Sequence, residues 1–236
     1  SKGVSCKKCA LGVQTGIQLG VDLLAEQTKK ITRVEHDMSL TIDYYFAPQS
    51  PWAYLGHQRF QTILKQAGAQ VRVMPIDLGG KVFPISGGLP LGQRAPQRQA
   101  YRLTELERFS KWLRAPLHLK PTYFPVSGDD AARLIIAVDM TAGSDAAMVM
   151  SGAVLTAVWS QQRNIADEKT LAELLSEQNL PASCLEQAYS QASQVRYESY
   201  TQMAIDAGVF GAPSYVVNGE IFWGQDRLDF VERAIA

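Results

Sequence analysis

Hydrophobic and polar positions change their period twice in the first part of the chain. Residues 40–46 form an apolar, aromatic run that is typical of a buried strand, and residues 71–74 alternate as a second strand that ends at Pro75. Between them, residues 51–67 place apolar side chains at helical spacing, and Gly68 supplies a stop signal. This strand–helix–strand order predicts a right-handed βαβ unit with two parallel strands.

The middle of the chain is predicted to be almost wholly helical. A glycine-rich stretch at residues 78–90 comes first; it lacks the spacing of a phosphate-binding loop, and its length indicates a lid or substrate loop. From about residue 97 to residue 207, apolar positions recur at helical spacing and no strand-like run interrupts them. We expect helices over residues 101–113, 130–140, 146–161, 171–178 and 186–207.

The end of the chain returns to strands. Residues 213–217 and 220–223 flank Asn218-Gly219, a strong two-residue hairpin signal, and an amphipathic helix follows from residue 225. The whole order predicts an α/β, thioredoxin-like fold with a large all-helical insertion domain. We place an N-terminal extension outside the compact fold at residues 1–37, the thioredoxin-like domain at 38–96 and 208–236, and the helical insertion at 97–207.

Composition narrows the class of protein. The chain is 46% hydrophobic and 19% charged, which is typical of a soluble globular protein, and its net charge of zero gives no indication of a nucleic-acid surface. No apolar run is long enough to span a membrane. The odd number of cysteines argues against a disulfide framework, and we expect Cys184 to pack as a small apolar residue.

Metal and redox chemistry have little support in the sequence. Cys6 and Cys9 form a CxxC pair, but no strand precedes it and no second pair follows, so a redox or zinc role is the less favoured interpretation. His57 and His118 have no metal-ligand partners at useful spacing, so we expect no metal.

The first candidate site lies where the first strand meets the first helix. Ser50 occupies the N-cap position and Pro51 the first helical position, which are the preferred places for these residues. A hydroxyl therefore lies at a helix N-terminus, where N–H groups converge and the dipole favours negative charge. Both an ordinary capped helix and an anion site fit this pattern.

Two later segments are expected to meet Ser50 in space. Pro213 would suit a cis peptide bond, which would offer the Ala212 backbone to an extended peptide; a trans proline that starts an edge strand is the alternative. Asp226, in the segment Trp223-Gly224-Gln225-Asp226, would either cap the last helix or hold an amine, while nearby backbone N–H groups hold a carboxylate.

Three segments together resemble the signature segments of the 2-hydroxychromene-2-carboxylate isomerase family, which is related to kappa-class glutathione transferases and DsbA-like thioredoxin folds. They are Ser50–Leu55, Val209–Pro213 and Trp223–Leu228, and they occur in the family's order between residue 40 and the C-terminus. The resemblance implies glutathione as cofactor, with Ser50 as the catalytic residue at its sulfur. The other implied cofactor contacts are Ala212, Pro213, Trp223, Gly224, Gln225 and Asp226.

The resemblance also implies a reaction. Reversible addition of the thiolate would open 2-hydroxychromene-2-carboxylate to trans-o-hydroxybenzylidenepyruvate. A free thiol has a pKa near 8.5, so a thiolate needs a positive helix end and a hydroxyl donor, which the helix at Pro51 and Ser50 would supply. Trp52, Tyr54, Phe60 and Trp159 are expected in the core or the pocket wall.

The contacts to an aromatic carboxylate substrate are harder to place. By family position they are Lys81, Gln93, Arg94 and Tyr123. Each cation could equally be a solvated loop residue. Gln93 stands where the family has Asn, and Pro48-Gln49 where an aromatic or aliphatic pair is usual, so the substrate's identity stays open.

Other functions remain alternatives. A kappa-like glutathione transferase or peroxidase would share the glutathione site, and a non-catalytic binding protein could keep the fold. A disulfide oxidoreductase is disfavoured, because the position expected to carry cysteine reads Ser50-Pro51-Trp52-Ala53. The resemblance further implies a cytoplasmic homodimer that serves aromatic-compound catabolism.

Overall fold

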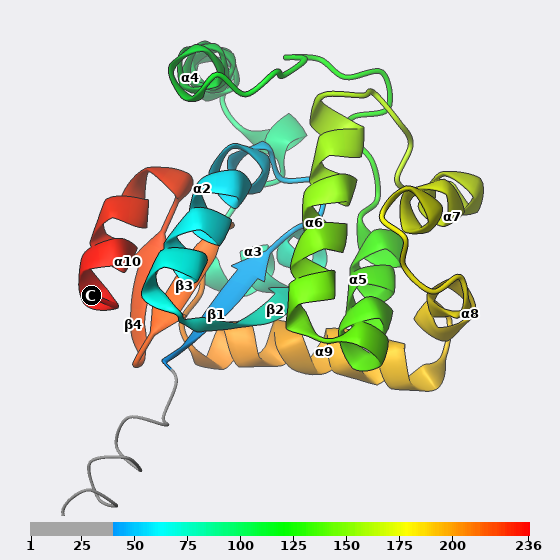
Figure 1. Ribbon diagram of the computed structural model, residues 1–236. Helices are drawn as coiled ribbons and strands as arrows, with labels where there is room; N and C mark the ends of the chain where they lie inside the picture. Colours follow the sequence, from blue (N-terminus) through cyan, green and yellow to red (C-terminus); the bar gives the residue numbers. More distant parts are fainter. Residues whose placement is uncertain (1–39) are drawn as a thin grey trace, which may run out of the picture. The chain divides into compact units, whose positions relative to one another are not determined.

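A mixed four-stranded sheet with the order β2-β1-β3-β4 forms the centre of the molecule (Figure 1). β1 (Thr41–Phe46) pairs in parallel with β2 (Gln70–Pro75). β3 (Ser214–Val217) is antiparallel to β1, and β4 (Glu220–Trp223) is antiparallel to β3. The computed structural model describes residues 40–236, so the predicted extension with its Cys6–Cys9 pair lies outside the described residues.

The βαβ unit is confirmed. Its helix, α2 (Pro51–Ala67), begins after the Ser50 N-cap and ends at Gly68, whose φ of 61° is the left-handed conformation that favours glycine. The C-terminal hairpin is confirmed too. Asn218 and Gly219 have φ values of 50° and 85°, which match the two positive angles that a type I′ turn requires.

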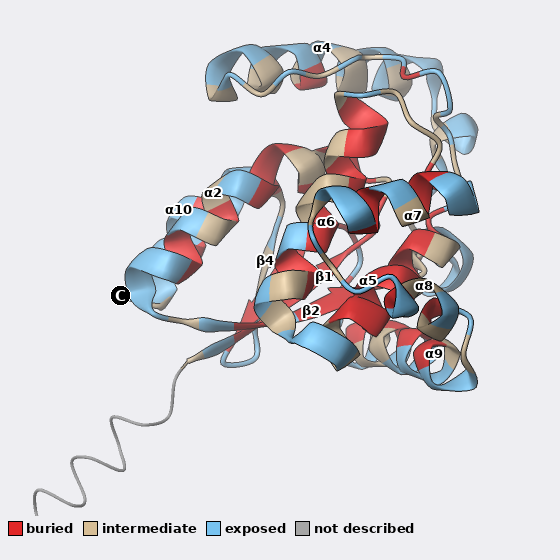
Figure 2. Ribbon diagram, turned by 45° about the vertical axis from the view of Figure 1, so that its right-hand side comes forward, coloured by how far each residue is buried: buried red, intermediate tan, exposed pale blue. Residues whose placement is uncertain are grey.

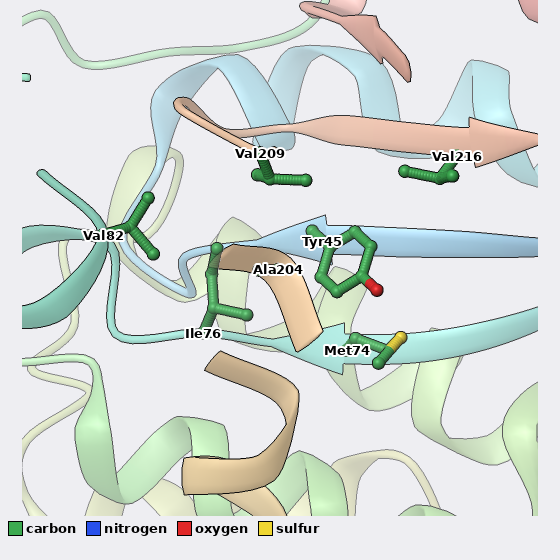
Figure 3. Packing of buried hydrophobic residues seen from close by; sticks show 7 residues of the cluster. All are labelled: Tyr45, Met74, Ile76, Val82, Ala204, Val209 and Val216. Atoms are coloured by element: carbon green, nitrogen blue, oxygen red, sulfur yellow. The ribbon is translucent and has the colours of Figure 1, made fainter. Parts of the chain in front are cut away.

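The two faces of the sheet bury different clusters. On the face toward α2, Tyr44 stacks on Phe46 and on Tyr215 with ring centroids 4.5 and 5.4 Å apart, and Phe60 of α2 closes the cluster at 5.0 Å from Tyr44. Because successive side chains of a strand point to opposite faces, Tyr45 lies on the other side. There it packs with Met74, Val216 and Ala204 of α9, as Figure 3 shows.

The segment between β2 and β3 is helical as predicted. Its main helices are α4 (Pro96–Leu113), α5 (Asp129–Ala142), α6 (Ser144–Trp159), α7 (Glu168–Glu177), α8 (Ser183–Ala188) and α9 (Gln191–Asp206). Cys184 is fully buried in α8, as expected of an apolar packing residue. This arrangement confirms the thioredoxin-like fold with a large helical insertion. Thr41–Ala236 form one compact unit, and the domain boundaries remain predictions.

Two predicted segments needed correction. The expected single helix over residues 186–207 is two helices, because the Ser190 hydroxyl caps α9 by accepting from the Ser193 N–H at 3.2 Å. The expected loop after β2 contains a π-helical turn (Leu78–Val82), the short helix α3 (Phe83–Ser86) and a 3-10 turn (Leu91–Gln93). The first of these turns forms because the Asp77 side chain caps it by accepting from the Gly80 N–H at 2.7 Å.

The last helix has an irregular start, and helix α4 buries little of its surface. The final helix predicted from residue 225 begins as a 3-10 turn (Gln225–Arg227) and continues as α10 (Leu228–Ala234). In helix α4 only Leu106 is buried, and Figure 2 shows the rest of the helix in the colours of exposed and half-buried residues. Within residues 40–236, no helix has the length and apolar character needed to cross a membrane.

Candidate active site

The register of the sheet brings the three predicted segments to one edge. Ser50 follows the end of β1. Pro213 directly precedes β3, whose first residue, Ser214, lies opposite Tyr45 near that same end of β1. Trp223 is the last residue of β4 and lies opposite Ser214. The ends of three neighbouring strands therefore place Ser50, Pro213 and Trp223 along the same border of the sheet.

Ser50 is an N-cap with donor capacity left over. Its hydroxyl accepts from the Ala53 N–H at 3.2 Å, its carbonyl accepts from the Tyr54 N–H at 3.1 Å, and the residue is 8% exposed. Among residues 40–236, the Ser50 hydroxyl donates no hydrogen bond and the backbone N–H of Trp52 has no partner. The first turn of α2 also has no acidic residue. This helix end therefore presents two hydrogen-bond donors without acceptors. The positive end of the helix dipole there is not offset by an acidic side chain of the first turn.

The histidines are not placed to activate Ser50 as a nucleophile. His57 lies in the interior with its Nε2 3.0 Å from the Met148 carbonyl, and burial lowers its pKa to about 4. His118 is exposed, and its backbone N–H donates to the Trp159 carbonyl. A Ser–His pair of the hydrolase type is therefore not formed by the described residues.

The Ala212–Pro213 peptide bond is cis, which decides between the two alternatives that the sequence left open. Both residues are buried beside Ser214, whose hydroxyl donates to the Gly211 carbonyl at 2.8 Å. The Pro213 carbonyl accepts from the Gly224 N–H at 2.9 Å. This bond joins the segment before β3 to the segment after β4.

Trp223 forms an exposed aromatic lip on this border. Its side chain is 51% exposed, and its ring packs edge-on against Phe210 with centroids 4.8 Å apart. A Cβ at Gly211 would overlap the indole, so glycine is what allows Trp223 to lie against the backbone there. The lip stands next to the Ala212–Pro213 bond.

Of the two roles predicted for Asp226, the helix cap is wrong. Asp226 does not cap the final helix: the cap positions are Gly224 for the 3-10 turn and Arg227 for α10, and neither supplies a side-chain hydrogen bond. Asp226 is instead exposed and pairs with Arg227 at 3.0 Å. Gln225 is 3% exposed, and its Cβ packs closely against Gly56 of α2.

On the helical side, Trp159 connects Ser50 to an aromatic and cationic wall. Its indole N–H donates to the Gln49 carbonyl at 3.3 Å, and Phe124 packs on it with ring centroids 4.7 Å apart. The guanidinium of Arg102 lies 5.4 Å from the Phe124 ring and 5.7 Å from the Trp159 ring. The family resemblance implies an aromatic contact near Tyr123-Phe124, of which Tyr123 was the predicted residue. Arg102 was not predicted, although Arg94, Arg98 and Arg102 at every fourth position are a signal visible in the sequence.

Burial and the neighbouring arginines lower the pKa values of Arg94 and Arg102 in this wall. Burial, together with a smaller effect of the neighbouring Arg94, lowers the pKa of Arg102 to about 10. Burial also lowers the pKa of Arg94, with a second contribution from Arg98. Arg94 donates its Nε–H to the Leu89 carbonyl at 2.8 Å, which leaves its other donors free. The wall thus carries excess positive charge.

The remaining predicted substrate residues are exposed on the surface. Lys81 and Gln93 are exposed, and Tyr123 is 49% exposed, whereas its neighbour Phe124 is the residue that contacts Trp159. Hydrogen bonds and ring contacts within residues 40–236 do not join these three residues to Trp159. Their roles stay predictions. The same part of the chain has no group of three or more His, Cys, Asp or Glu side chains that could hold a metal ion.

Comparison with known proteins gives the class. Residues 41–236 match the family model of the DSBA-like thioredoxin domain. A 2-hydroxychromene-2-carboxylate isomerase from Sphingobium xenophagum is 30% identical over 196 residues, which cover 83% of this chain and 97% of the relative. Its counterpart from Pseudomonas putida is 29% identical over 83% of this chain and 94% of its own.

Structural similarity leads to the same family. A solved structure of 2-hydroxychromene-2-carboxylate isomerase matches with a TM-score of 0.70 and 26% identity, over 83% of this chain and 94% of that chain. Glutathione S-transferase kappa 1 from Caenorhabditis elegans is 24% identical over 80% of this chain and 88% of its own. The chain therefore belongs to the 2-hydroxychromene-2-carboxylate isomerase branch of the DsbA-like thioredoxin family. Its relatives are named as isomerases and as a glutathione transferase, so this is a family of enzymes.

Proposed function

We propose that this protein is a glutathione-dependent isomerase that converts 2-hydroxychromene-2-carboxylate or a similar intermediate to trans-o-hydroxybenzylidenepyruvate. The observation that carries the proposal is the end of α2, where the Ser50 hydroxyl and the Trp52 N–H are both free to donate. These are the groups that a thiolate needs. The name of the nematode relative, a glutathione transferase, supports the choice of thiol.

Glutathione would lie along the border of the sheet that runs from Ser50 to Asp226. The Ala212 backbone before the cis-proline would pair with the middle of the peptide, as an added strand does. Pro213, Trp223, Gly224, Gln225 and Asp226 complete the proposed contacts, with the γ-glutamyl end at the exposed Asp226 carboxylate. Gln225 is buried against α2, so it would act by shaping this end rather than through its side-chain amide.

Bound glutathione would supply a thiolate that adds reversibly to the substrate and leaves again unconsumed. Ser50 would donate a hydrogen bond from its hydroxyl to the negatively charged sulfur. The backbone N–H of Trp52 and the α2 dipole would stabilise the same charge. A hydrogen bond to a charged group contributes about 1.5–3 kcal/mol. A thiol held here is thus expected to ionise about 1 to 2 pKa units below its ordinary value of about 8.5.

Substrate would lie on the helical side of Ser50, against the half-buried Phe124, which packs on the fully buried Trp159. The family positions Lys81, Gln93, Arg94 and Tyr123 remain its proposed contacts, with Arg94 adjoining this wall. A homodimer in the cytoplasm is also part of the proposal, and it rests on the family resemblance alone.

The test compares two reactions with one protein. Ultraviolet spectra should show 2-hydroxychromene-2-carboxylate disappearing only when both protein and glutathione are present. Conjugation of chlorodinitrobenzene, measured in parallel, tests the alternative of a kappa-like transferase, which the nematode relative supports. Conjugation without isomerisation would reject the isomerase in favour of the transferase. Failure of both reactions, with no binding to immobilised glutathione, would leave a non-catalytic binding protein.

A further inference from the structure

Helix α4 directs a cation at the aromatic wall beside Ser50. The Arg102 guanidinium lies over two rings at once, 5.4 Å from Phe124 and 5.7 Å from Trp159, and the residue is partly buried. Guanidinium groups stack favourably on aromatic faces, which fixes the direction of their N–H donors. Packing therefore holds Arg102 in place, and the N–H donors at the edge of its guanidinium remain available.

Arg102 has no anion of its own. Within residues 40–236, Arg94, Arg98 and Arg102 form no ion pair, and Arg102 donates no hydrogen bond. By contrast, Arg108 on the same helix pairs with Glu105 at 2.5 Å, although its side chain is 64% exposed. A partly buried cation without an acidic partner is costly, and here a second cation, Arg94, adds to the cost. An arriving anion would relieve it.

The position of Arg102 relates this cation to the proposed chemistry. Trp159 carries Arg102 on its ring, and its N–H donates to the carbonyl of Gln49, the residue before Ser50. One aromatic side chain thus separates the guanidinium from the residue proposed to hold the sulfur.

We propose that Arg102 is the specificity-determining residue that binds the carboxylate of an aromatic substrate. The planar guanidinium can donate two parallel N–H bonds to a carboxylate, and the half-buried Phe124, which packs on the fully buried Trp159, offers apolar surface to the attached ring. Arg94 adds positive charge beside it. This inference rests on the proposed function for the class of substrate, and it assigns the carboxylate to a residue outside the family positions given above.

The experiment measures binding rather than turnover. The full chain is titrated with trans-2-hydroxycinnamate, with the matching uncharged amide, and with glutathione, followed by calorimetry. We expect the wild type to bind the acid roughly tenfold or more tightly than the amide, and Arg102→Gln to lose about ten- to a hundredfold in affinity for the acid only. Arg108→Gln is the matched control and should bind all three as the wild type does.

Several results would overturn the inference. One is a wild type that does not bind the acid, or binds acid and amide equally. Another is an Arg102→Gln variant that loses affinity for glutathione instead, which would assign Arg102 to a carboxylate of the cofactor. Arg102→Lys keeps the charge but not the planar fork, and it should retain only part of the preference, so it serves if the glutamine variant fails to fold.

Failure here and failure of the proposed function are separable. A protein that prefers the acid through Arg102 but does not isomerise the chromene rejects the proposed function alone. A protein that isomerises it while Arg102→Gln keeps the full preference for the acid rejects this inference alone.

Discussion

Ser50→Ala separates the two roles that the Ser50 hydroxyl combines, because the chain contains a matched cap elsewhere. Ser50 accepts from the Ala53 N–H at 3.2 Å at the start of a 17-residue helix. Ser190 accepts from the Ser193 N–H at 3.2 Å at the start of a 16-residue helix. As helix caps, the two hydroxyls accept the same bond, although the Ser190 hydroxyl also donates to the Ser193 Oγ at 3.4 Å.

The stability effects should therefore match. Losing a serine N-cap costs about 1 kcal/mol, so Ser50→Ala and Ser190→Ala should each lower the free energy of unfolding by that amount. For a protein of this size, the melting temperature should fall by about 2–4 °C in each variant. Urea denaturation and thermal melting followed by circular dichroism measure both quantities.

The activities should differ. Only Ser50 has a donor proposed to face the sulfur, and a hydrogen bond to a charged group is worth about 1.5–3 kcal/mol. Isomerase kcat/KM should fall by about ten- to a hundredfold in Ser50→Ala and stay near the wild-type value in Ser190→Ala. The absorbance of bound thiolate near neutral pH should fall in parallel. Equal, small losses of activity in both variants would refute the reasoning, since Ser50 would then be only a cap.

Three further predictions concern the surroundings of the site. Gly56→Ala would place a Cβ 2.8 Å from the Cβ of buried Gln225, so the free energy of unfolding should fall by about 1–3 kcal/mol in urea. Burial lowers the pKa of His57 from 6.5 to about 4, so as the pH falls through this window the unfolded chain takes up a proton first. Stability should then decrease by up to about 1.4 kcal/mol per pH unit, and His57→Gln should remove that slope from pH-dependent urea curves. Trp159→Phe removes the N–H that donates to Gln49 and should cost about 1–3 kcal/mol, while the acid-over-amide preference in calorimetry survives because the ring is kept.

Two of these have a control in the chain. Gly92→Ala meets no atom within 4 Å and should leave stability nearly unchanged. His118→Gln alters an exposed histidine and is the comparison variant for His57→Gln. Equal effects of Gly56→Ala and Gly92→Ala, an unaltered slope in His57→Gln, or loss of the acid preference in Trp159→Phe would contradict the respective prediction.

Features fixed by neighbours in sequence were predictable. The cap at Ser50, the stop at Gly68 and the turn at Asn218-Gly219 each depend on the chemistry of two or three adjacent residues. The parallel pairing of the first two strands followed because such a pair requires a crossover helix. The meeting of Ser50 with Pro213 was expected from the thioredoxin-like order of elements along the chain.

Features that depend on the path of long connections were not predictable. Phe124 reaches Trp159 from the connection between α4 and α5, whose course no periodicity determines, so Tyr123 was chosen by family position instead. The break at Ser190 was hidden because helical spacing continues on both sides of it. Burial of Gln225 arises from close approach to Gly56, a contact between elements far apart in sequence.

The sparse packing of α4 has a consequence for how ligand occupancy could be observed. Leu106 is the one buried residue of its 18, and what holds it near the body includes the edge-on contact of Phe109 with Trp52 and the stacking of Arg102. A helix with so few buried contacts opens locally at a free energy far below that of global unfolding, so its amide hydrogens should exchange with solvent early. An anion that bridges Arg102 to the body would slow that exchange without any reaction taking place. Deuterium uptake along α4 would thus report on binding at the aromatic wall even in a protein whose turnover has been abolished.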